Sequence, residues 1–176
     1  MQAHRSEIAA VDKAGCGRER VIQIRAAVTT DGGATIAMMG RCSSKTLFHR
    51  FHGYVDAAGH LKRQRDGSTA IFLAWQGQTC VGMGELANDA HLAVLVADGW
   101  QGRGVGTRLL SAVVDEAAVR DFDVLHADIL REDAFLLGGL RRIGPLTVSH
   151  QIEVLSVDIK IGGPLKRSSS RCLRVS

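Results

Sequence analysis

One glycine-rich stretch of the sequence has the residue types and spacing to bind a phosphate group. Gln101-Gly102-Arg103-Gly104-Val105-Gly106 follows an apolar, strand-like run and opens an amphipathic helical stretch. Glycines let a phosphate approach the backbone without interference from a Cβ atom, and the first amides of a helix have no intrahelical acceptor. The helix dipole adds partial positive charge at the same end, which Arg103 and Arg108 supplement. The spacing therefore predicts an anion site at residues 101–107.

Two better-known phosphate loops do not fit this stretch. A P-loop closes with Gly-Lys-Ser or Gly-Lys-Thr, and neither Gly104 nor Gly106 is followed by lysine. The dinucleotide-binding pattern Gly-x-Gly-x-x-Gly, counted from Gly102, ends on Thr107 instead of glycine. Taken alone, the stretch is equally consistent with a glycine-rich turn that merely starts a helix.

The segments around the loop alternate between strand and helix patterns. Strands are expected at residues 21–26, 70–75, 79–86, 91–96, 124–130 and, as one or two closing strands, 146–161. Helices are expected at residues 30–39, 43–51, 104–119 and 133–143, and the third of these has one apolar face made by Val105, Leu109, Val113 and Ala117. Short polar connections between the middle strands indicate antiparallel hairpins. The sequence thus predicts a mixed α/β (α+β) fold with a mostly antiparallel sheet and a central strand-helix-strand crossover.

The length and composition indicate one domain. A chain of 176 residues with 45% hydrophobic residues has enough apolar material for a single well-buried core. We expect this domain to span residues 21–161, between a flexible N-terminal segment at residues 1–20 and a basic flexible tail at residues 162–176. Residues 53–68 have the composition of a loop.

No stretch is apolar enough over about 18 residues to cross a membrane, and the first 20 residues carry charges where a signal peptide needs apolar ones. The four cysteines are scattered without a Cys-x-x-Cys pair, so the sequence suggests neither a zinc site nor a disulfide framework. We therefore expect a cytoplasmic protein with no metal and no membrane contact. The net charge of +4 and the pI near 9.1 favour anionic partners. They do not favour nucleic acid, because the basic residues form no stripe interleaved with aromatic ones.

The run from Ala93 to Leu110 resembles the central motif of the GNAT superfamily of N-acetyltransferases, Gln/Arg-x-x-Gly-x-Gly/Ala. Residues 21–26 resemble the family's opening arginine-containing strand, and residues 132–144 resemble its Glu-Asn…Leu-Gly segment in spacing. A further segment, residues 43–51, is similar to Ser-x-x-Ser-Leu-x-x-Arg-Phe of bacterial protein-lysine acetyltransferases, although an ordinary amphipathic helix explains it equally well.

The resemblance implies the GNAT fold and direct transfer of an acetyl group from acetyl-CoA to a primary amine, in a small molecule or a protein lysine. No covalent enzyme intermediate is needed. It also implies that the strand backbone at Val94, Leu95 and Val96 binds the pantetheine arm. The pyrophosphate would lie on the loop formed by Gln101, Gly102, Arg103, Gly104, Val105, Gly106 and Thr107. Monomer and homodimer both stay open.

The sequence departs from the family pattern where proton transfer is expected. Lysine-acetylating relatives commonly have glutamate where this chain has His91, so His91 and Glu85 are both candidates for the general base. Asp133 replaces the family's usual asparagine beside the cofactor, where a cofactor contact and a helix cap are both open. The family's common tyrosine acid is absent from the region of Gly139 and Leu140, and the only tyrosine is Tyr54. An alternative function is therefore a non-catalytic acyl-CoA-binding regulatory module.

Overall fold

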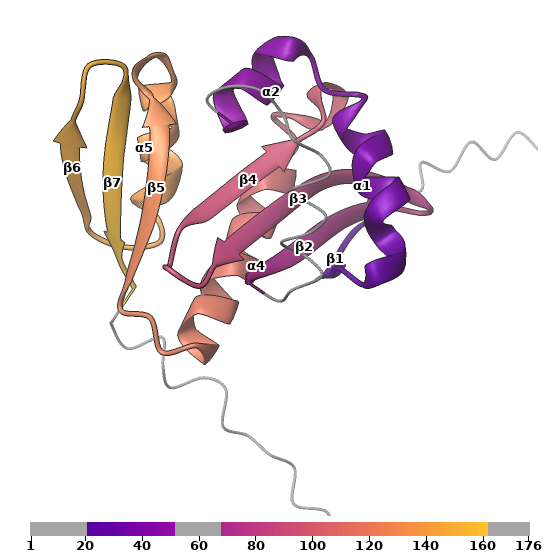
Figure 1. The fold of residues 1–176 in the computed structure, drawn as a ribbon, viewed down its shortest axis with the longest axis horizontal. Helices are drawn as coiled ribbons and strands as arrows, with labels where there is room; N and C mark the ends of the chain where they lie inside the picture. Colours follow the sequence, from indigo (N-terminus) through magenta and orange to yellow (C-terminus); the bar gives the residue numbers. More distant parts are fainter. Residues whose placement is uncertain (1–20, 52–67, 162–176) are drawn as a thin grey trace, which may run out of the picture.

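The computed structural model describes residues 21–51 and 68–161, whose strands form two antiparallel sheets (Figure 1). The first sheet has four strands in the order β1-β2-β3-β4, namely β1 (Ile22–Ala26), β2 (Thr69–Gln76), β3 (Thr79–Ala87) and β4 (Leu92–Val96). The second has three strands in the order β5-β7-β6, namely β5 (Val124–Leu130), β6 (Leu146–His150) and β7 (Val154–Lys160). The expected α/β fold with mostly antiparallel strands is confirmed.

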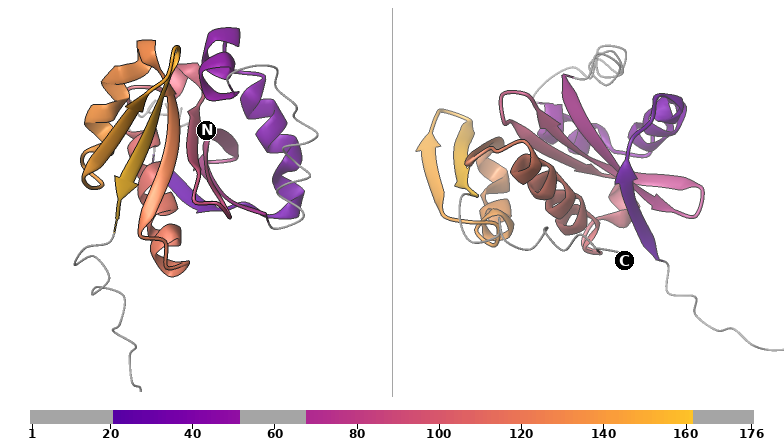
Figure 2. Two further views of the ribbon diagram at one scale, coloured as in Figure 1. Left: turned by 60° about the vertical axis from the view of Figure 1, so that its left-hand side comes forward. Right: turned by 90° about the horizontal axis from the view of Figure 1, so that it is seen from below.

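Helices cover both faces of the four-stranded sheet (Figure 2). On one face lie η1 (Thr29–Asp31), α1 (Gly32–Met39) and α2 (Ser44–Phe51), and on the other lies α4 (Val105–Val119). Met38 of α1 packs with Leu73 and Met83 of the sheet, whereas Leu109 of α4 packs with Val81 from the opposite side. The sheet is therefore buried on both faces, which accounts for the nearly continuous apolar run in β2 and β3.

The apolar face expected for α4 is confirmed, because Val105, Leu109, Val113 and Ala117 are all at most 1% exposed. Two glycines of β3 let this helix approach the sheet closely. A Cβ atom on Gly82 would lie 2.9 Å from the Leu95 carbonyl oxygen and 3.1 Å from Leu109 Cδ1, and one on Gly84 would lie 3.0 Å from Val113 Cγ2. The helix and β4 thus occupy space that any larger residue at these positions would need.

The opening strand is fixed to α1 by an arginine-carboxylate pair. Arg25 donates two hydrogen bonds to Asp31, at 2.7 and 2.8 Å, and its guanidinium lies 4.7 Å from the centre of the Trp75 ring. These bonds, with a further one from the Val28 amide, hold the pKa of Asp31 below its usual value. The pair sets the position of the first helix against β1 and β2.

The two sheets meet at one point. η2 (Asp98–Trp100) and α4 connect β4 to β5, which confirms the expected strand-helix-strand crossover. Where β4 and β5 come together, a single parallel bridge joins His91 to His126, and beyond it the two strands diverge (Figure 1).

The helix expected at residues 133–143 is confirmed only in part. The chain instead forms η3 (Arg131–Leu136), followed by the short α5 (Leu137–Leu140). Asp133 has non-helical backbone angles, with φ −95° and ψ 16°. Gly138 and Gly139 lower helix propensity by about 1 kcal/mol each relative to alanine, so no longer helix forms.

Several expectations lie outside the described residues: the N-terminal segment at residues 1–20, the loop up to residue 67 including Tyr54, and the tail at residues 162–176. Among the helices of the described segments, none has the length and apolar character needed to span a bilayer.

The space around two glycines predicts opposite effects of alanine substitution. Gly82 lies under α4, and Gly33 lies in open space on α1. Gly82→Ala places a methyl group against the Leu95 backbone, so it should lower the free energy of unfolding by about 1–3 kcal/mol. Gly33→Ala in α1, where a Cβ meets nothing within 4 Å, should raise it by about 0.4–1 kcal/mol. Urea denaturation followed by circular dichroism measures both. Equal stabilities for the two variants would contradict the packing described.

Candidate functional site

A cleft of about 990 Å³ opens where β4 and β5 diverge. α2 borders one side of it, and η3 and α5 border the other. Most of the site residues expected from the sequence line this cleft: Glu85, His91, Val94, Leu95, Val96, Gln101, Gly102, Gly104, Gly106, Thr107 and Asp133. Residues from five separate elements are thus brought to one place.

Two of the expected residues lie beside the cleft but do not line it. The Val105 side chain is 1% exposed and belongs to the core under α4. Arg103 is exposed, and its guanidinium lies 5.2 Å from the centre of the Trp100 ring. The backbone amides of Val105 and Arg103 can still contact a ligand bound to the loop. The Arg103 side chain adds positive charge at the surface.

The glycine-rich loop has the backbone geometry of an anion site. Gly102 and Gly104 have φ values of 71° and 77°, in the left-handed region that other residues adopt only with strain. Within the described part of the chain, no hydrogen bond is found from the backbone amides of residues 102–107, and the first bond into α4 is donated by Arg108 to Gly104 at 3.2 Å. Several amide groups at the positive end of a 15-residue helix are therefore available to a ligand.

Side chains tie this loop to α2 and to the end of β4. The side-chain amide of Gln101 donates through Nε2 to the Val96 carbonyl at 3.1 Å and to the Thr46 hydroxyl at 3.3 Å. Asp98 accepts a hydrogen bond from the Ser43 amide at 3.0 Å, and its hydrogen bonds with Thr46 and Ser43 hold its pKa below the usual value. Gln101 therefore anchors the loop, and the start of α2 is fixed to it.

β4 offers a backbone edge to the cleft. It pairs with β3 on one side and is the last strand of the four-stranded sheet in the described residues. On its other side, among the described residues, its pairing with β5 is limited to the bridge between His91, just before β4, and His126. Because the alternate residues on either side of Val94 are the ones that bond to β3, the edge backbone at Val94 is open to an extended ligand that hydrogen-bonds as a strand would.

The two candidate bases differ in their surroundings. Glu85 is buried, with its side chain only 10% exposed, and forms an ion pair with Arg50 of α2. The His91 side chain is 51% exposed, and its Nδ1 lies 3.3 Å from Asp89. Protonation of Glu85 would remove the negative charge that pairs with Arg50, whereas the Nε2 atom of His91 can accept a proton while the contact with Asp89 stays intact.

Asp133 holds the two sides of the cleft together. Its carboxylate lies 2.6 Å from His49 Nδ1, and Glu132 lies 2.7 Å from His49 Nε2. Asp133 is inside η3, whose N-cap residue is Leu130, so it does not cap the helix. We call this contact between His49, Glu132 and Asp133 the α2–η3 clasp.

Sequence reasoning missed His49, Arg50 and Asp128, which are ionisable residues that line the cleft, and His126, which lines a smaller hollow beside it. The first two lie in α2, within the segment whose likeness to lysine acetyltransferases was noted. The strand alternation at residues 124–130 places His126 and Asp128 on one face, and that pattern was available from the sequence. No local sequence pattern predicts that this face of β5 lies beside the start of β4.

The chain matches the sequence profile of the acetyltransferase (GNAT) domain over residues 33–155. This region contains β2 to β6, the glycine-rich loop and the clasp. No curated protein matches the chain.

Solved structures share the fold at low sequence identity. The GNAT domain of S. lividans PAT superposes with a TM-score of 0.69 at 17% identity, covering 79% of this chain and 90% of that one. A putative acetyltransferase from Salmonella typhimurium with its cofactor acetyl-CoA gives 0.66 at 18% identity, covering 81% and 95%. Spermidine N-acetyltransferase from Vibrio cholerae, in complex with CoA and spermine, gives 0.62 at 14%, covering 79% and 95%.

The clasp predicts that one histidine restrains the cleft. His49→Ala removes both contacts to η3 and should lower the free energy of unfolding by about 1–3 kcal/mol, because two carboxylates lose a hydrogen-bonding partner. Amide hydrogen exchange at residues 131–136 should accelerate. Lys45→Ala, at an exposed position of the same helix, is the matched control. If η3 exchanges equally fast in both variants, the clasp does not hold it.

Proposed function

The chain belongs to the GNAT family of acetyltransferases, which use acetyl-CoA, and we propose that it transfers the acetyl group directly to a primary amine. Residues 21–161 form the proposed acetyltransferase domain. The observation that carries the proposal is that one cleft joins an anion site at its helical end to a histidine-carboxylate pair where β4 and β5 meet. Those are the two requirements of the reaction, a hold on the phosphates of acetyl-CoA and a group that removes a proton from the amine.

In this proposal the backbone binds acetyl-CoA. The amides of residues 102–107 receive the pyrophosphate, and the left-handed Gly102 and Gly104 let it approach. The open edge of β4 at Val94 accepts the pantetheine arm as an added strand, whereas the Leu95 backbone is directed at β3. A β4 amide near the thioester can polarise its carbonyl oxygen.

His91 is the proposed general base. Its imidazole lines the cleft, and Asp89 beside Nδ1 leaves Nε2 for a proton from the acceptor. The pKa of Asp89 is held below its usual value by a hydrogen bond from the His91 amide, so this carboxylate is charged and favours the imidazolium that forms. Glu85, fixed by Arg50, instead adds negative charge to the acceptor side of the cleft.

A direct attack agrees with the state of the thiols. Burial raises the pKa of Cys42 to about 11 and also raises that of Cys80. Both cysteines of the described residues are therefore protonated at neutral pH and poor nucleophiles. This supports attack by the amine itself and not by a cysteine of the enzyme.

Structural neighbours are named for several amine acceptors: spermidine, and the alanine of a ribosomal protein in Brucella melitensis. For this chain we favour a protein lysine, on the likeness of residues 43–51 to lysine acetyltransferases. That segment forms α2, which supplies His49 and Arg50 to the cleft.

Cofactor binding depends on the backbone at the start of α4. Gly104→Glu strains a left-handed position and places a carboxylate at the helix N-terminus, so it should weaken coenzyme A binding by at least 10-fold. Gly99→Glu adds the same charge to the same segment at a glycine without positive φ and outside the cleft lining. Calorimetric titration should find near wild-type affinity for this control. Equal affinities for the two variants would place the phosphates elsewhere.

Thiol release under saturating acetyl-CoA tests the reaction. A panel of a lysine peptide, a peptide with an N-terminal alanine, spermidine and small primary amines should identify an acceptor that releases coenzyme A. His91→Gln should then lower kcat by roughly 10²-fold without changing coenzyme A affinity, because only proton removal is lost. If the wild-type protein binds acetyl-CoA but no amine gives release above background, a non-catalytic acyl-CoA-binding module is the better account.

A further inference from the structure

One wall of the cleft is attached weakly to the rest of the domain. η3 buries none of its six residues, and Phe135 on it is 74% exposed. Gly138 and Gly139 follow it, and a Cβ atom at either position would meet nothing within 4 Å. A segment with few buried apolar contacts opens locally at a low cost in free energy. The position of η3 therefore depends on its polar contacts, of which the clasp reaches across the cleft.

The opposite wall of the cleft is held by contacts with its neighbours. In α2, Arg50 forms an ion pair with the buried Glu85 of β3, and the Thr46 hydroxyl accepts a hydrogen bond from Gln101 at 3.3 Å. Thr46 and Arg50 both lie within one helical turn of His49. His49 is thus fixed on the anchored side of the cleft, and the clasp ties the weakly attached wall to it.

The clasp uses both nitrogens of one imidazole. Nδ1 of His49 lies 2.6 Å from Asp133, and Nε2 lies 2.7 Å from Glu132. Carboxylates only accept hydrogen bonds, so both contacts form together only when both ring nitrogens carry a proton. The neutral ring has a single donor, and its bare nitrogen repels the other carboxylate. The complete clasp therefore requires the charged imidazolium.

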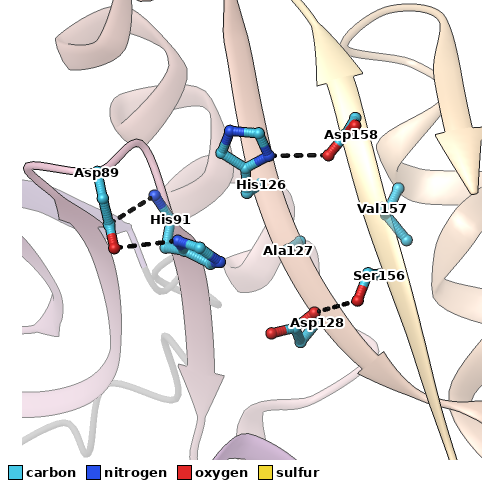
Figure 3. Close-up of a pocket in the computed structure, with 8 residues that line it drawn as sticks. All are labelled: Asp89, His91, His126, Ala127, Asp128, Ser156, Val157 and Asp158. Carbon is cyan, nitrogen blue, oxygen red and sulfur yellow. Dashed lines mark hydrogen bonds and ion pairs between the residues drawn. The ribbon is translucent and has the colours of Figure 1, made fainter. Parts of the chain in front are cut away.

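The histidines at the junction of β4 and β5 have no such requirement. His91 and His126 each contact a carboxylate through Nδ1, that of Asp89 and of Asp158, so a neutral ring satisfies either pair (Figure 3). Among the histidine contacts within residues 21–51 and 68–161, those of His49 alone need the charged ring. Histidine is also the side chain that ordinarily changes its charge between pH 5 and 8.

We propose that His49 is a proton-operated latch on the coenzyme A cleft. With a proton on both nitrogens, the ring ties η3 to α2 and keeps the cleft closed. When the ring releases one proton to the solvent, Glu132, whose side chain is 60% exposed, turns to water. One contact instead of two then holds η3, so the cleft opens more often and coenzyme A enters faster as the pH rises. This inference rests on the proposed function, because it takes coenzyme A to bind in this cleft.

The neighbouring charges leave this direction of the pH response unchanged. Arg50 and Glu85 neutralise each other as an ion pair. Among the described neighbours of the clasp, only His91 is of a type that ordinarily changes its charge between pH 5 and 8, and variants at position 49 retain it. β4 has no ionisable side chain. The charged or titratable side chains around the clasp, from α2, β3, the start of β4, η2 and β5, are Lys45, Arg50, Glu85, His91, Asp98 and Asp128.

A static link between the two walls is the competing explanation. In that case the ring keeps one charge state throughout, and the contact with the exposed Glu132 adds little, as surface ion pairs do. A static link predicts that η3 is equally well protected from hydrogen exchange at every pH in this range. The latch predicts that protection falls as the pH rises, because the neutral ring loses one of its two contacts.

Amide hydrogen exchange without ligand tests the latch itself. The protection factors of residues 131–136 in the wild type, corrected for the intrinsic effect of pH, should fall about 10-fold from pH 5.5 to pH 8. His49→Arg has a permanent charge and can donate to both carboxylates, so its protection should stay high at both pH values. His49→Ala should be weakly protected at both. The control His150→Gln, exposed on β6 and outside the cleft lining, should match the wild type.

Stopped-flow binding of coenzyme A tests the effect on the ligand, with tryptophan fluorescence as the signal because Trp100 directly precedes the loop. The association rate constant of His49→Ala divided by that of the wild type should fall from about 10 at pH 5.5 to about 2 at pH 8. This ratio cancels the titration of the coenzyme A phosphates and of His91, which the two proteins share. His49→Arg should associate slowly at both pH values.

Three results overturn the latch: wild-type protection of residues 131–136 that is equal at both pH values, a ratio of association rate constants independent of pH, or a change in the dissociation rate alone. The last would make the clasp a strap that retains bound ligand. Should His49→Arg fail to fold, Glu132→Gln keeps the histidine and decides, because a side-chain amide can bond to the charged or the neutral ring and should remove the pH dependence. If protection falls with pH but coenzyme A never binds, the proposed function fails and the proton-dependent clasp remains.

Discussion

The site depends on a strand that has a neighbour along only part of its length. β4 pairs with β3 along its whole length, but in the described part of the chain its pairing with β5 is limited to the bridge between His91 and His126. Unpaired backbone groups at a strand edge are costly when buried, so the open edge of β4 must be satisfied by solvent or by a ligand. The divergence of the strands therefore creates the cleft and supplies hydrogen-bonding groups along one wall. β4 ends at Val96, and only η2 separates it from the loop that begins α4.

In the proposed function, main-chain groups bind the cofactor and side chains transfer the proton. In this proposal the phosphates bind main-chain amides at the start of α4, whose direction is fixed by Gly102 and Gly104 and by the burial of Val105 and Leu109 below. In the same proposal, proton transfer depends on side chains, above all His91 with Asp89. Main-chain contacts of this kind do not depend on side-chain identity, which agrees with a fold shared with three solved structures at 14–18% identity.

Local patterns predicted the elements well where periodicity was strong. The four-residue spacing of Val105, Leu109, Val113 and Ala117 identified both the helix and its buried face. At residues 133–143 the pattern predicted one regular helix, whereas the chain forms η3 and then α5, with non-helical backbone angles at Asp133, which contacts His49. The strand order β5-β7-β6 and the meeting of His91 with His126 come from contacts distant in sequence, which residue spacing does not contain.

We propose that one ligand binds both to the loop amides and to the open edge of β4. Hydrogen exchange resolved to single amides, with and without saturating coenzyme A, tests it most directly. We expect protection to increase at residues 102–107 and at the β4 amides that face the cleft, while the amides between β6 and β7 stay unchanged. Protection confined to another surface, or none at residues 102–107 despite saturation, would contradict the account.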